Sequence, residues 1–180
     1  MRLSALFLAI AASLLIARPA TAERIEHFKK IGNWDGGAYT HSKTGKFSHC
    51  AASASYRNGN TLIFAIYKNR TWALGIANKD WKLKVGDTYA VRYRIDKGAE
   101  HSGKAGAVAD NQIKLPLPGD NKLFDRMRNG SLLTVVLKSK TTSFETTKFE
   151  TTKFKLTSTN AILTRLFKCV GEWRKNPKYQ

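Results

Sequence analysis

Acidic residues are scarce in this chain: its 180 residues include 13 Asp and Glu against 31 Lys and Arg, and the formal net charge is +18. Cysteine is scarcer still. Cys50 and Cys169 are the two in the chain, and no Cys-x-x-Cys spacing supports a redox or metal site. The one long apolar run, residues 3–17, is too short for a stable transmembrane helix, which needs roughly 20 apolar residues. We therefore expect a strongly basic protein without a spanning segment.

Catalytic motifs are also missing. The chain contains no Gly-x-Ser-x-Gly, no His-Glu-x-x-His, no phosphate-binding loop and no Cys-x-x-Cys-His. Its four histidines stand at spacings that match no metal-ligand pattern, although His41 and His49 could converge across a loop. A carboxylate pair for glycoside hydrolysis could form in three dimensions, but the sequence selects none. The sequence leans toward a protein that is not an enzyme and that uses no cofactor or metal.

The N-terminus has the form of a secretory leader. Arg2 precedes the apolar run, Pro19 interrupts it, and Ala20-Thr21-Ala22 offers the small residues that signal peptidase requires. This predicts a signal peptide over residues 1–22, cleavage after Ala22, and a periplasmic or secreted mature protein. Loss of Arg2 and Arg18 leaves 29 basic and 13 acidic residues, a net charge of +16. Such a charge attracts polyanions or acidic proteins.

The two cysteines then predict one disulfide. In an oxidising compartment an even number of cysteines indicates pairing, and Cys50 and Cys169 have no other partner. Closing a loop of about 120 residues stabilises a fold by about 4–5 kcal/mol in the chain-entropy model. The bond would join the first predicted strand to the last predicted helix.

Alternating apolar residues predict a mainly β fold. From Phe47 the pattern has a period of two, and Asn58-Gly59 is a strong hairpin signal. We expect residues 47–95 to form consecutive antiparallel strands, a β-meander that builds a sandwich or a partly open barrel. Residues 23–46 read as an irregular lead-in. Pro116 and Pro118 argue against a central strand near them.

Two helices and a repeat complete the domain, which spans residues 47–170. Asp120 caps a short helix near 120–128, and Ser158 or Thr159 caps a C-terminal helix near 159–169. The apolar face of the second helix contains Ile162, Leu163, Leu166, Phe167 and Val170. The repeated Phe-Glu-Thr-Thr-Lys segment, residues 144–153, favours a hairpin or an extended edge strand. Residues 171–180 form a polar tail that we expect to be flexible.

One basic segment is the best candidate for binding. Lys79, Lys82 and Lys84 surround the aromatic Trp81, while Arg92 and Arg94 point away from the apolar face of the next strand. Together they would suit phosphate or sulfate groups. The alternative is that Trp81 belongs to the core and the charges solvate an edge. Cations among aromatics also suit single-stranded nucleic acid, but the secretory leader argues against that physiological role.

An ordered set of residues resembles a known family. The set is Trp34, Gly45-Lys46-Phe47-Ser48-His49-Cys50, Trp72-x-Leu74-Gly75, Asp80-Trp81-x-Leu83, Gly86-Asp87-x-Tyr89 and residues 163–170. It resembles small secreted alphaproteobacterial proteins that are distantly similar to the invasion-associated locus B family. The resemblance covers most of residues 31–170. It implies a periplasmic or envelope-associated β-rich protein connected with host contact, and it supplies no catalytic residues.

Three hypotheses follow. The first is a non-enzymatic binding protein that engages an anionic envelope or host component. The second is a hydrolase of an anionic polysaccharide or peptidoglycan, and the third is an adaptor or inhibitor of another secreted protein. The sequence leaves the oligomeric state open.

Overall fold

The computed structural model describes residues 22–140 and 147–180, and the mainly β class is confirmed. No helix in these ranges is long and apolar enough to cross a membrane. The described residues form β1 (Arg24–His27), β2 (Asp35–Thr40), β3 (Phe47–Ser55), β4 (Asn60–Tyr67), β5 (Trp72–Asn78), β6 (Thr88–Ile95), β7 (Glu100–Ala109), β8 (Gln112–Leu117), α1 (Asn121–Asn129), β9 (Leu132–Lys140), β10 (Thr147–Lys155), α2 (Thr159–Trp173) and a 3-10 turn (Pro177–Tyr179).

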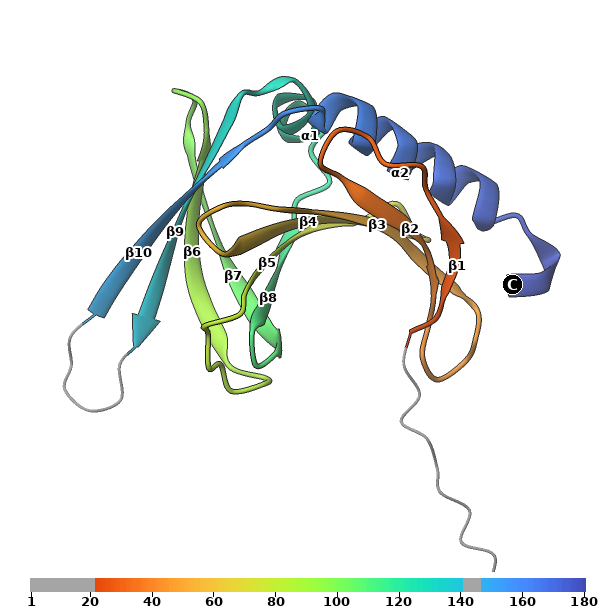
Figure 1. Cartoon of the computed structure of the whole chain (residues 1–180), viewed down its shortest axis with the longest axis horizontal. Helices are drawn as coiled ribbons and strands as arrows, with labels where there is room; N and C mark the ends of the chain where they lie inside the picture. The colour runs from red at the N-terminus through yellow and green to blue at the C-terminus, as the bar shows by residue number, and fades with distance from the viewer. Residues whose placement is uncertain (1–21, 141–146) are drawn as a thin grey trace, which may run out of the picture.

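All described strands belong to one open antiparallel sheet with the order β1-β2-β3-β4-β5-β8-β7-β6-β9-β10. Figure 1 shows that the sheet is strongly curved and does not close. The predicted hairpin at Asn58-Gly59 is confirmed. Ser55 pairs with Thr61, Gly59 has a φ of 78°, and the amide of Tyr56 donates to Asn60 O at 2.9 Å.

The predicted meander is correct for β3, β4 and β5 but wrong at the next step. β5 pairs with β8, whereas β6 pairs with β7 and β9. The connection of residues 79–87 therefore passes β8 and β7 before β6 begins. Residues 82–85 form no strand, although we expected consecutive strands over residues 47–95. The β7–β8 hairpin occupies the edge of β5 at which such a strand would pair.

Pro116 lies in a central strand, contrary to expectation. It faces Ala73 of β5, while the pairing of β8 with β7 ends at Lys114. A proline lacks the N–H that a two-sided ladder uses, and here the ladder has become one-sided. Pro116 therefore lies where the pairing of β8 with β7 has ended, and it does not prevent β8 from forming a strand.

The lead-in of residues 23–46 is not irregular, because it supplies β1 and β2. Gly37 allows the close approach of these strands: a Cβ there would lie 1.9 Å from Glu26 O. Trp34 is buried, and its indole donates to Thr157 O at 2.9 Å. This contact joins the connection between β1 and β2 to the residues before α2.

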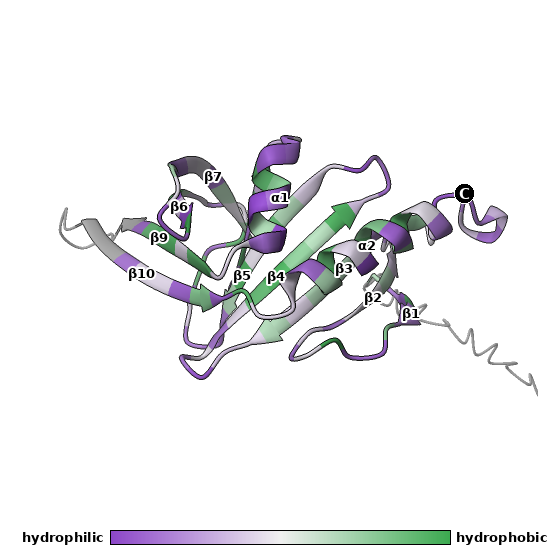
Figure 2. Ribbon diagram, turned by 90° about the horizontal axis from the view of Figure 1, so that it is seen from above, coloured by the Kyte–Doolittle hydropathy of each residue, from purple (hydrophilic) through white to green (hydrophobic). Residues whose placement is uncertain are grey.

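The core lies between one side of the sheet and the helices. Leu62, Phe64 and Ile66 alternate along β4 and are at most 1% exposed. α2 lies across β2, β3 and β4, and α1 packs on α2 (Figure 2). α1 follows its prediction closely: the Asp120 carboxylate accepts the amide of Lys122 at 2.8 Å, and Met127 is buried.

α2 differs from its prediction in three ways. It continues to Trp173, so the predicted tail begins with helix and also contains the 3-10 turn. Ser158 precedes it with a φ of 60° but makes no side-chain cap. Phe167, expected on the apolar face, is 47% exposed, because it lies beyond the sheet-facing stripe of Leu163, Leu166 and Val170.

The second copy of the Phe-Glu-Thr-Thr-Lys segment lies in β10, which is an edge strand. An extended edge strand was one of the two predicted structures for this repeat. Phe154 is buried against Tyr56, with ring centroids 5.1 Å apart. Residues 141–146, which hold much of the first copy, lie outside the described ranges, as does the predicted leader up to residue 21.

Candidate anion-binding surface

Arg92 and Arg94 lie on the side of the sheet that faces away from the core, as predicted. The residues that alternate with them along β6 are buried, namely Val91, Tyr93 and Ile95. Arg92 donates to the Glu100 carboxylate at 3.2 Å, and both side chains are about half exposed to solvent. Such an exposed pair contributes little to stability. The two guanidinium groups are therefore presented to solvent by the strand alternation itself.

Strand register places further cations beside them. Lys104 of β7 and Lys138 of β9 both pair with Ala90 of β6, one row from Arg92. β10 pairs with β9, and Glu100 is the only acidic residue that the described parts of β6, β7, β9 and β10 place on this side. The exposed basic side chains here, which we call the basic face, are Arg92, Arg94, Lys104, Lys138, Lys153 and Lys155.

Lys82 and Lys84 are exposed but lie in the β5–β6 connection. That connection is held against the β7–β8 turn, since Leu83 N donates to Asp110 O at 2.6 Å. Arg94 lies six residues beyond the start of β6, which corresponds to about 20 Å along a strand. Joint action of all four predicted cations stays a prediction.

Trp81 is half-buried and packs against the core. Its amide donates to Asn78 O at 3.1 Å and closes the turn after β5. The structure thus gives Trp81 a packing role. Only the exposed part of the Trp81 ring is accessible for the predicted contact with a ligand.

An aromatic row crosses the same side of the sheet over β2, β3 and β4. Tyr39 and His49 stack with a centroid distance of 5.2 Å, and Tyr67 packs against His49 at 5.4 Å with its ring tilted. Arg24 lies over the ring of Tyr39 and Lys114 over that of Tyr67. Burial, and then the charge of Lys114, lowers the pKa of His49 to about 4. His49 is therefore neutral near pH 7.

The structure does not bring His41 and His49 together by any contact. His41 instead accepts the amide of Lys43 in the loop after β2. Within the described residues, no group of three His, Cys, Asp or Glu could hold a metal ion. Asp96, which borders one surface cavity, accepts the amides of Ser131 and Leu132 and so has a structural task. The contacts of His41 and Asp96 are thus with backbone amides of neighbouring loops and strand ends.

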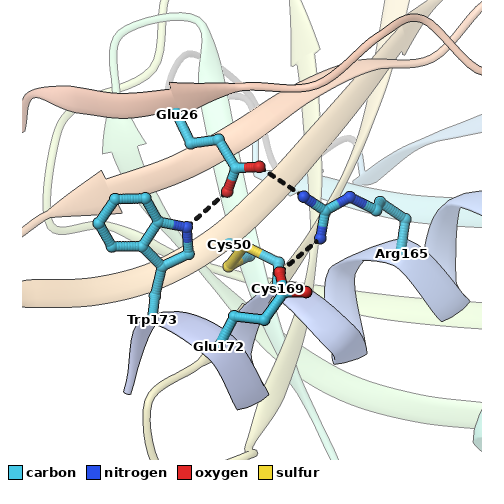
Figure 3. The surroundings of a disulfide bond; sticks show 6 residues. All are labelled: Glu26, Cys50, Arg165, Cys169, Glu172 and Trp173. Carbon is cyan, nitrogen blue, oxygen red and sulfur yellow. Dashed lines mark hydrogen bonds and ion pairs between the residues drawn. A yellow bond between two sulfur atoms is a disulfide. The ribbon is translucent and has the colours of Figure 1, made fainter. Parts of the chain in front are cut away.

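The Cys50–Cys169 disulfide is confirmed. The two Cα atoms lie 6.3 Å apart, both side chains are fully buried, and the bond links β3 to α2. Figure 3 shows this bond beside a charged cluster that sequence reasoning missed. The Glu26 carboxylate accepts from Arg165 and from the indole of Trp173, both at 2.5 Å. No local pattern reveals the cluster, because Glu26 and Arg165 lie 139 residues apart in the chain.

No protein-family model matches the sequence, and no curated protein does. A solved structure shows a similar fold. The chain is similar in fold to invasion associated protein B from Bartonella henselae. The TM-score is 0.57 at 15% sequence identity, over 80% of this chain and 97% of that chain. The expected resemblance is confirmed at the level of the fold.

Proposed function

We propose that this protein is a non-enzymatic binding protein of the periplasm or the cell exterior, whose basic face engages an anionic component of the envelope or of a host. The observation that supports it most is the gathering of six exposed cations with one carboxylate on neighbouring strands. The disulfide is compatible with an oxidising compartment. The structurally similar protein is named for an association with invasion, which fits a role in host contact.

The chemistry of the face favours phosphate or sulfate groups. Neighbouring strands lie about 4.8 Å apart, so Lys104 and Lys138 stand about 10 Å apart across β6. Arg92 and Arg94 add planar guanidinium groups that can bind two oxygens at once. A polymer with repeated anionic groups can contact several of these side chains together. A single small anion would contact one exposed cation, and such a solvent-exposed ion pair is weak.

The test is the salt dependence of binding to lipopolysaccharide and to a heparin-like polymer. Each cation that contacts the polymer releases counterions, so the affinity falls with salt, and each lost contact reduces the slope by about 1. We expect Arg92→Ala/Arg94→Ala to weaken binding and to reduce the slope by about 2.

Lys82→Ala/Lys84→Ala is the matched control, since it removes the same charge from the β5–β6 connection. An equal loss in both double variants would mean that net charge alone drives binding. Arginine variants that keep the affinity and the salt slope of the wild type would contradict the proposal. Single-stranded nucleic acid is measured in parallel as the polymer that the export signal argues against.

A further inference from the structure

Phe167 is exposed at a place where the surrounding aromatic side chains are not. It projects from α2 with 47% of its surface in solvent, while Trp72 nearby is 5% exposed. Phe124 lies between them, with centroids 5.0 Å from Trp72 and 6.4 Å from Phe167. The aromatic cluster therefore continues from the core to the surface at this point.

A small cavity opens beside this cluster. Its apolar lining includes Ile66, Trp72, Phe124 and Phe167, and its volume is about 80 Å³. The indole N–H of Trp72 already donates to Pro118 O at 2.7 Å, so the ring presents carbon to the cavity. Pockets for whole small molecules hold about 300–1,000 Å³. This cavity has room for a single apolar group.

The rim of the cavity carries one cation in an unusual backbone conformation. Arg70 closes the β4–β5 hairpin with a φ of 66°, a region that favours Gly or Asn at this place in a turn. Its guanidinium lies 5.3 Å from the ring centroid of Phe167. Among the described residues it forms no ion pair, whereas Asp120 across the rim is engaged as the cap of α1.

A strained residue that keeps a long side chain points to a use for that side chain. Arg70 brings a charge to an apolar opening, and that charge favours an anion next to the apolar group. The mature chain is also basic as a whole, which attracts acidic segments. A single buried anchor with a charged contact at its edge is the usual form of a binding hot spot.

We propose that this cavity binds one aromatic or aliphatic side chain of an acidic segment in a partner protein, with Arg70 pairing with a carboxylate beside that anchor. The site is separate from the basic face, since it is built from β4, β5, α1 and α2. It gives the protein a second, sequence-selective contact. The proposal does not depend on polymer binding.

The experiment follows the indole N–H resonance of Trp72 in the mature, disulfide-bonded chain. The probes are three five-residue peptides: Phe between two pairs of Glu, Ala between two pairs of Glu, and Phe between two pairs of Lys. We expect saturable shifts with the first peptide and at least tenfold weaker binding of the other two. Hexanoate is added as a fourth probe.

Three variants localise the site. Gly119→Trp is expected to abolish the shift, because a Cβ at Gly119 meets no atom within 4 Å and the indole can fill the cavity. Gly171→Trp, equally unobstructed on α2, is the control and should bind as the wild type does. Arg70→Gly removes the charge and relieves the backbone, so the fold is kept while the preference for Glu over Lys falls severalfold.

Several results would overturn the proposal. Equal binding of the Phe and Ala peptides would mean that charge alone acts, and unchanged binding in Gly119→Trp would place the contact elsewhere. Hexanoate that binds Trp72 as tightly as the Phe peptide would assign the cavity to small amphiphiles. Arg92→Ala/Arg94→Ala must leave peptide binding unchanged. Failure of this site is thereby distinguished from failure of the basic face.

Discussion

Removal of the disulfide is the perturbation with the largest expected effect on this fold. The bond joins residues 119 positions apart, and in the chain-entropy model a loop of that length corresponds to about 4–5 kcal/mol. Cys50 and Cys169 are both fully buried, so Cys50→Ala/Cys169→Ala also loses the contacts of two sulfur atoms. For the 158 residues that follow the predicted leader, about 2–4 °C per kcal/mol predicts a fall in Tm of about 8–20 °C.

The assay is thermal and urea unfolding of the mature wild type, with and without reductant, beside the double variant. Reductant is expected to lower the stability of the wild type toward that of the variant, which lacks the buried sulfur atoms as well, and to leave the variant unchanged. A loss below about 1 kcal/mol would refute the reasoning, because it would mean that contacts between α2 and the sheet already restrict the unfolded chain. Two free thiols per denatured, non-reduced chain would refute the bond itself.

Two further predictions concern charge. His49 has a folded pKa of about 4 against 6.5 unfolded, so stability is full above pH 6.5 and falls by up to about 3 kcal/mol as the pH drops to about 4. Urea midpoints across this range should flatten in His49→Gln, and an unchanged slope would contradict the assignment. Glu26→Gln breaks the ion pair with Arg165 and should cost about 1–2 kcal/mol in urea unfolding. Glu172→Gln, in a more exposed pair with the same arginine, is the control, and equal losses would argue against a special role for Glu26.

Local patterns predicted the elements that depend on local chemistry. The Asn58-Gly59 turn and the Asp120 cap follow from short-range hydrogen bonds and backbone preferences, and both are present. The outward direction of Arg92 and Arg94 follows from strand alternation alone. Cysteine count and compartment were enough to predict the Cys50–Cys169 bond.

The strands β1 and β2 could not be predicted in the same way. β1 is four residues long and β2 holds Gly36 and Gly37, so neither carries an apolar alternation strong enough to identify. Their formation depends on β3, which pairs with β2, and on α2, which contacts β2. For the same reason, the Glu26–Arg165 pair, 139 residues apart in the chain, was not foreseen.

The sequence by itself determined the class of fold, the cross-link, the direction of the charges on β6 and a basic surface of some kind. These depend on composition and on spacings within one element. Tertiary structure alone decided that β8 and not β6 lies beside β5, and that Lys104 and Lys138 stand with Arg92. It also decided that Phe167 stays exposed next to Arg70. The physical reason is that register and helix rotation are set by packing across the whole sheet, to which residues far apart in the chain contribute together.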